Sequence, residues 1–436
     1  MKEVDNCMKE FFRLEELKTD VYTETMAGLT TFVTMAYIII VNPSILSAAG
    51  VPFDQVFIAT IASAVIGTLI MALFANYPIA IAPGMGMNAY FASVVAIQGV
   101  SYQTVLGAVF FASVLFLLLS FTKFRELLID SIPAPLKVGI TAGIGLFIAF
   151  LGLRMSGIVV PDEETYVAFG DVTEPMTTLA IIGIFLTLIL NARNVRGSLF
   201  IGMFVTAVIA SFLGMLEVDG IMSLPPAPVF FDFDLAGVFT HGLYGVIFAF
   251  LLVTIFDTTG TMIGVAEQAG LMKNGHLPKA SSALTADAVA STVGASLGST
   301  PSSAYVESSA GVAAGGRTGL TSVIVAILFV FALFFSPIVA AVADVPAITA
   351  PALIIVGSYM MNGLAKVRWD EFDEAFPTFA IILTMPLTSS IATGIAMGFI
   401  IYPLLKVASG KAKTVPGIIY LFGIIFAIQL IFFPMH

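Results

Sequence analysis

Apolar runs of roughly 18 to 22 residues, separated by short polar stretches, recur along the chain from about residue 22 to its end. Each run is long enough to cross a hydrocarbon core of about 30 Å as a helix. The pattern therefore predicts fifteen helical segments, near residues 25–45, 55–75, 79–98, 102–122, 134–154, 176–193, 196–216, 243–265, 281–298, 301–316, 318–343, 346–364, 374–388, 390–408 and 415–434.

The amino-acid composition indicates that these segments belong to an integral membrane protein. Hydrophobic residues make up 58% of the 436 residues and charged residues only 11%, more apolar surface than a soluble domain of this size buries. The lipid bilayer is thus an expected partner, and a net charge of −10 argues against nucleic acid. Cys7, the single cysteine, excludes an internal disulfide and a cysteine-based metal cluster. The charged N-terminal stretch is not typical of a cleavable signal peptide.

The distribution of basic residues predicts the orientation. If the N-terminus is cytoplasmic, every lysine and arginine except Arg154 falls on the inner side, as the positive-inside rule requires. The outward loops, such as 156–174, are acidic. We expect a multi-pass plasma-membrane protein with a cytoplasmic N-terminus, in which only the final segment, 415–434, could lie along the surface instead of spanning.

Two prolines on each side of the chain's midpoint indicate a repeat. Pro83 and Pro301, each beside the start of a small-residue helix, lie 218 positions apart (301 − 83), and Pro133 and Pro346, each opening a span, lie 213 apart (346 − 133). Seven spans separate the members of each pair, and an odd number inverts the second copy relative to the first. The expected fold class is an all-α membrane protein with a seven-plus-seven inverted repeat and an appended C-terminal segment.

Segments three and ten, at 79–98 and 301–316, are too rich in glycine, proline and serine for continuous helices. We expect each to enter extended and to become a half-helix near the bilayer midplane, where free backbone N–H groups can face a ligand. Glu307 lies at that depth in "SSAYVESSAGVAAGG", with serines such as Ser303 available for backbone groups that the break leaves open.

Asp257, in "VTIFDTTGTMIGV", is a second acid well inside an apolar segment. A carboxylate at mid-span costs about 2.5–3.5 kcal/mol even on gentle insertion scales, and such groups are functional by default. The structural alternatives are that Asp257 bonds its own helix through a neighbouring threonine and that Glu307 stays protonated and only packs. Asn88, beside the break in segment three, is either a ligand or an amide that closes a local turn.

Two sequence matches to enzyme motifs lack the structural context that each motif requires. "GVAAGGRT", at 311–318, is close to a phosphate-binding loop but lacks the preceding strand. "GASLG", at 294–298, matches a nucleophile elbow, yet it lies within an apolar span, and the three histidines fall in loops or at the terminus. We therefore expect no enzyme activity, no metal site and no organic cofactor.

Four phrases resemble the xanthine/uracil permease superfamily, specifically its AzgA-like hypoxanthine/guanine/adenine branch: "TTFVTMAYIIIVNP", "IAPGMGMNAYFA", "FDTTGTMIGVAEQAGL" and "AYVESSAGVAAGGRTGLTSV". They occur in the family's order and span nearly the whole chain. The resemblance implies a fourteen-helix fold in which a core domain moves against a gate domain. The implied division is a cytoplasmic N-terminus at 1–24, core at 25–122, gate at 123–216, an external loop at 217–242, core at 243–343, gate at 344–408 and the appended segment at 409–436.

The resemblance also implies uptake of a nucleobase coupled to a cation, with the base bound between segments three, eight and ten. By motif, the binding residues fall on Asp257, Glu307 and Asn88, and we add Ser303, Tyr305 and Gly86 from the broken segments. Asp257 and Glu307 are the expected proton-coupling groups, although other branches have a histidine where this chain has Thr261, which leaves the proton relay open.

The expected function is a purine nucleobase symporter for guanine or hypoxanthine, with adenine as a further candidate substrate, H⁺ as the coupling ion and Na⁺ as its alternative. The competing readings are a sulfate or bicarbonate transporter of similar fold and a passive channel. A homodimer through the gate domain is a further expectation of the family resemblance.

Overall fold

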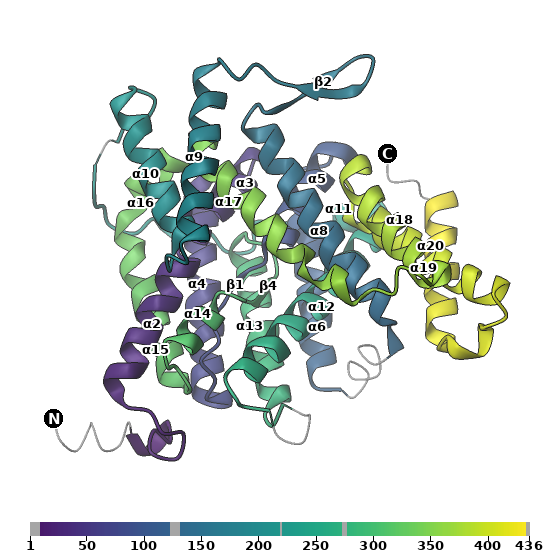
Figure 1. Cartoon of the computed structure of the whole chain (residues 1–436), viewed down its shortest axis with the longest axis horizontal. Coiled ribbons are helices and arrows are strands. Elements are labelled where there is room, and N and C mark those ends of the chain that lie inside the picture. Colours follow the sequence, from purple (N-terminus) through teal and green to yellow (C-terminus); the bar gives the residue numbers. More distant parts are fainter. Residues whose placement is uncertain (1–8, 123–130, 219, 273–276, 433–436) are drawn as a thin grey trace.

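The computed structural model describes residues 9–122, 131–218, 220–272 and 277–432, so parts of the predicted N-terminus, of the first gate segment and of the C-terminal segment lie outside it. A helix overlaps each of the fifteen predicted segments, as in a largely helical membrane protein (Figure 1). In the first half the helices are α2 (Val21–Met35), α3 (Ile38–Ala48), α4 (Phe53–Ile70), α5 (Met85–Gln98), α6 (Tyr102–Ser120), α8 (Ala134–Met155), α9 (Pro175–Ala192) and α10 (Ser198–Phe212).

The second half repeats this order. Its helices are α11 (Leu235–Thr240), α12 (Tyr244–Gln268), α13 (Ala280–Leu297), α14 (Ser308–Ala313), α15 (Gly319–Ala332), α16 (Ser336–Ala343), α17 (Pro346–Tyr359), α18 (Phe372–Thr388), α19 (Ile391–Ala408) and α20 (Gly417–Phe432). Within the described ranges, eight helical stretches have the length and apolar composition of a full membrane span.

The two predicted breaks are present and face each other. Strand β1 (Ile81–Pro83) precedes α5, strand β4 (Ser302–Ala304) precedes α14, and the two strands pair antiparallel at the centre of the molecule (Figure 1). Ile81 pairs with Ala304, and Pro83 pairs with Ser302, so the pairing is unchanged when the two strands are exchanged. This is the contact that a two-fold axis between the halves produces.

The helix caps repeat across the same axis. Asp20 caps α2 by accepting from the N–H of Thr23, and Asp234 caps α11 by accepting from the N–H of Gly237. Ser101 caps α6 with its hydroxyl, and Thr318 caps α15 in the same way. Each cap satisfies a backbone donor that the first helical turn leaves open. The halves therefore share local structure although their sequences have diverged.

Helix packing shows two sets of strongly contacting helices. Helix α13 packs on α4 and α6, and α15 packs on α2 and α4, whereas α8 packs on α17 and α18, and α9 packs on α10 and α17. The exact domain boundaries stay a prediction. Helix α20 packs on α19, and the rings of Phe422 and Phe426 lie 5.1 and 5.4 Å from that of Phe248 in α12.

The loops at equivalent places in the two halves differ in charge. Loop 156–174 holds a hairpin of β2 (Val159–Asp162) and β3 (Tyr166–Phe169), in which hydrogen bonds from Thr165 hold the pKa of Asp162 below its usual range. The loop that follows α17 leads into an ion-pair network in which Arg368 bonds Glu374. Lys406 of α19, 3% exposed, pairs with Asp373 and Glu374 at 3.0 Å.

Candidate functional site

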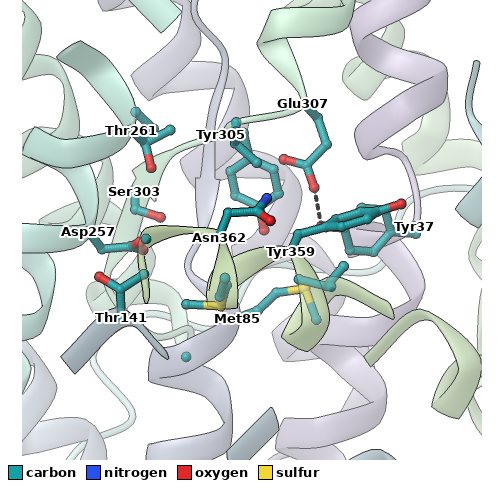
Figure 2. A pocket seen from close by; sticks show the side chains of 16 residues that line it. Tyr37, Met85, Thr141, Asp257, Thr261, Ser303, Tyr305, Glu307, Tyr359 and Asn362 are labelled. Atoms are coloured by element: carbon teal, nitrogen blue, oxygen red, sulfur yellow. Dashed lines mark hydrogen bonds between the residues drawn. The ribbon is translucent and has the colours of Figure 1, made fainter. Parts of the chain in front are cut away.

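A cavity of about 430 Å³ lies beside the central strand pair (Figure 2). This volume is in the range of small-molecule pockets. The side chains and backbone that line it come from both halves of the chain: Tyr37, Met85, Gly86, Thr141, Asp257, Thr261, Ser303, Ala304, Tyr305, Val306, Glu307, Val356, Tyr359, Met360, Asn362 and Gly363. Five of the six predicted site residues are in this lining, and Asn88 is not.

Glu307 lies at the start of α14, after the extended backbone of β4, and its carboxylate points toward the cavity (Figure 2). The hydroxyl of Tyr37 donates a hydrogen bond to Glu307 Oε1 at 2.6 Å. Tyr37 lies where the first span breaks between α2 and α3. The bond fixes the orientation of the carboxylate in the cavity wall. Sequence reasoning missed Tyr37 because a tyrosine in an apolar run is usually a packing residue.

Asp257 reaches the cavity from α12, and the hydroxyl of Ser303 in β4 is its hydrogen-bond partner. Gly84 lies close to this pair. A Cβ built there would collide with Met87 Cε and would lie 3.2 Å from Ser303 Oγ. The neighbouring Thr258 bonds a different acid, donating to Asp287 Oδ2 at 2.5 Å.

Tyr305 and Gly86 hold the two broken segments in place. The hydroxyl of Tyr305 donates to the carbonyl of Pro83 at 2.6 Å, which ties the end of β4 to the end of β1. Met85 and Gly86 form the first turn of α5 and line the cavity, and the N–H groups of a first turn have no partner within their own helix. A Cβ at Gly86 would collide with Ile144 Cγ2 of α8, so only glycine allows this close approach.

Asn88 lies elsewhere than predicted. Its side chain is fully buried, and its Oδ1 accepts a hydrogen bond from the hydroxyl of Thr300. One turn after the start of α5, Asn88 points away from the cavity and toward the chain that precedes β4. Thr300 is 212 positions away, so this bond does not close a local turn, and a ligand role for Asn88 stays a prediction.

A second part of the lining, the neutral wall, comes from α8, from α17 and from the short 3-10 helix Met360–Lys366. Its polar groups are neutral, namely Thr141, Tyr359 and Asn362, and sequence reasoning singled out none of them. Tyr359 donates to Asn191 Oδ1 at 2.8 Å. The two walls therefore differ: one presents two carboxylates, the other neutral hydroxyl and amide groups.

The electrostatics of the cavity favour hydrogen-bond donors. Two carboxylates face it, and the lining described by the structure contains no lysine or arginine. An ionised carboxylate only accepts hydrogen bonds. Over the described residues, no group of three His, Cys, Asp or Glu side chains could hold a metal ion. The site can thus bind a small neutral or cationic molecule with N–H groups.

Comparison with known proteins identifies the family of the chain. The permease family model for xanthine/uracil permeases matches residues 23–397. The chain belongs to this permease family. The permease is 57% identical over 428 residues to the guanine/hypoxanthine permease PbuO of Bacillus subtilis, covering 96% of this chain and 99% of that protein. It is 42% identical over 428 residues to the adenine permease AdeQ of Escherichia coli, covering 97% and 96%.

The solved structures confirm the fold of the permease. The transmembrane domain of the cyanobacterial bicarbonate transporter BicA superposes with a TM-score of 0.65 at 16% identity, covering 86% of this chain and 97% of that domain. At this identity the likeness concerns architecture only. The predicted transporter fold is confirmed, and the function must come from the site.

Proposed function

We propose that this permease carries purine bases across the plasma membrane together with protons, by alternating access of the cavity. The observation that supports it best is that Asp257 and Glu307, two acids from segments far apart in the sequence, line one cavity beside the broken segments. Relatives named as guanine/hypoxanthine and adenine permeases cover nearly the whole chain. Purine bases are flat molecules with N–H groups, which suit an acceptor-rich cavity.

In this proposal Glu307 holds the base. Guanine presents N1–H and its 2-amino group side by side, so a carboxylate can accept both in charge-assisted bonds. Tyr37 already occupies one face of Oε1 and keeps the carboxylate oriented while the base enters. Aromatic rings of Tyr305 and Tyr359 in the same lining offer apolar surface to the flat faces of the base.

Asp257 is the proposed proton-coupling group, together with Glu307. The partner of Asp257 in the described part of the chain is the neutral hydroxyl of Ser303, so the carboxyl can gain or lose a proton without breaking an ion pair. Protonation from one side of the membrane and release on the other would couple the proton gradient to the movement of core against gate. In the same proposal the N-terminus is cytoplasmic, and dimer formation through the gate domain stays a prediction.

The hypothesis of an anion transporter of similar fold has less support than purine symport. Carboxylates facing a cavity without a described lysine or arginine repel an anion, and likeness to a bicarbonate transporter at 16% identity concerns architecture. No observation favours a passive channel.

Competition of radiolabelled hypoxanthine uptake tests the proposal. We expect guanine, hypoxanthine and adenine to inhibit uptake in cells that express the permease, and sulfate and bicarbonate to have no effect. Accumulation should collapse with a protonophore. Replacing Na⁺ by choline should leave it unchanged, whereas a loss of uptake in choline would assign Na⁺ as the coupling ion. Inhibition by anions alone, or uptake that never exceeds equilibrium, would contradict purine symport.

A further inference from the structure

The neutral wall of the cavity contains one polar side chain that the protein itself leaves uncommitted. Tyr359 donates to Asn191, and the hydroxyl of Thr141 donates to the carbonyl of Lys137 at 3.2 Å. The carboxamide of Asn362, in the short helix after α17, is exposed and lines the cavity. In the described part of the chain no group bonds it. Figure 2 draws Asn362 between Asp257 and Glu307 in projection.

A base that fills the cavity displaces the water around this amide. A polar group that loses water without gaining a partner weakens binding, so the base must offer one to Asn362. The acids on the other wall only accept hydrogen bonds, whereas a carboxamide both donates and accepts. The two walls therefore recognise different edges of the base.

We propose that Asn362 reads the edge of the purine formed by N7 and the substituent at position 6, and that it favours 6-amino over 6-oxo bases. A carboxamide pairs with adenine through two bonds, accepting from N6–H and donating to N7. A 6-oxo base offers two acceptors on that edge, so the amide NH₂ gains a bond while its oxygen meets a lone pair. This inference rests on the proposed purine transport.

The preference at Asn362 is opposite to that of Glu307, which favours guanine because its N1–H and 2-amino group are donors. Charge-assisted bonds are about twice as strong as neutral ones, so guanine still leads in the wild type. Asn362 reduces the difference in affinity between guanine and adenine. Because Glu307 and Asn362 have opposite preferences, the permease accepts several purines instead of one.

The test measures inhibition constants of adenine and hypoxanthine for the wild type, N362L, N362A and N362Q. Leucine has a similar size but no hydrogen-bonding group, and alanine removes the amide with less packing change. We expect both to raise the adenine-to-hypoxanthine ratio of inhibition constants about three- to tenfold, the value of one neutral hydrogen bond. N362Q, which keeps the amide, should restore most of the wild-type ratio.

Ser358→Ala is the matched control. Ser358 lies in α17, four residues before Asn362 (362 − 358) and outside the cavity lining, and its hydroxyl donates to the carbonyl of Ile355 at 2.6 Å. Its ratio should equal that of the wild type. If N362L fails to insert, N362A decides the question. If purines inhibit the wild type but N362L and N362A leave the ratio unchanged, only this inference is overturned. If no purine inhibits the wild type, the proposed function is overturned as well.

Discussion

The two broken segments share the same order of elements but differ in length and in chemistry. Each consists of a three-residue strand followed by a helix, and the strands pair with each other. After β1, Met85 and Gly86 open α5, a helix of 14 residues without a charged side chain. After β4 come Tyr305 and Glu307, and α14 has only 6 residues.

The difference shows that the repeat positions the backbone, whereas the chemistry of the site comes mostly from one half. Both carboxylates, Asp257 and Glu307, belong to the second half. The first half supplies the donor Tyr37 to Glu307 and the side-chain-free surface of Gly86. A two-fold axis brings two chain breaks together at one depth, and a purine, which has no such symmetry, requires unlike groups on either side of it.

The largest effect concerns the inversion itself. The loops 156–174 and 360–371 are equivalent in the two halves, so an inverted repeat places them on opposite sides of the membrane. With Cys7 replaced by serine, a cysteine in place of Glu164 should react with an impermeant maleimide in intact cells. A cysteine in place of Asp370 should react only after permeabilisation. Both positions are exposed. Labelling of both from one side would contradict the inverted repeat.

The next largest effect is expected at Asp257. Asp257→Asn keeps the shape of the side chain and removes its ability to take up a proton, so we expect accumulation of hypoxanthine to fall at least about tenfold while the protein stays folded and inserted. Asp54→Asn is the control, because Asp54 is an exposed acid at the start of α4, outside the cavity. Normal concentrative uptake by detergent-stable Asp257→Asn protein would remove Asp257 from the mechanism.

Glu307→Gln tests the binding role of the second half. The amide oxygen can still accept from Tyr37, so the site keeps its shape, but one acceptor becomes a donor. We expect guanine to lose about 10- to 100-fold in affinity. The wild-type order guanine, hypoxanthine, adenine, with about 1–3 kcal/mol between its ends, should flatten or invert. Inhibition constants for the three bases measure it, and values equal to the wild type would mean that Glu307 is a protonated packing residue.

The sequence was sufficient for the fold because each of its signals is local. Apolar runs predicted the helices, and prolines beside small residues predicted both breaks. An acid at mid-span stands out in any apolar segment, which is why Asp257 and Glu307 could be found. These signals come from the hydrophobicity of the bilayer and from the chemistry of the backbone, so they can be recognised without knowing which segments are in contact.

The rest of the site depends on contacts that a sequence does not display. The pairing of β1 with β4 joins three-residue stretches about 220 positions apart (302 − 81 gives 221), too short for a periodic pattern. Tyr37 and Tyr359 look like packing residues until their partners are seen. Asn88 was assigned to the ligand by motif, but its position in α5 directs it to Thr300. Which face of a half-helix meets the cavity is a tertiary property.

The smallest expected effect compares one glycine from each broken helix. Gly311 of α14 packs against α2 within the core, where a Cβ would collide with Thr31 and lie 2.8 Å from the backbone oxygen of Ala27. A backbone atom cannot turn aside, so Gly311→Ala should destabilise the protein by about 1–3 kcal/mol and lower its melting temperature. Gly86 of α5 instead meets a side chain, that of Ile144, on α8, a helix of the predicted gate domain.

Gly86→Ala should therefore disturb the contact between the predicted core and gate domains more than the stability of either domain. We expect transport to slow about fivefold, the effect of about 1 kcal/mol on the barrier, with a melting temperature near that of the wild type. Removing the branched side chain with Ile144→Ala should restore the rate in the double variant, because the new methyl group then has room. A rate that stays low in the double variant would mean that Gly86 acts on the bound base and not on the contact between the domains.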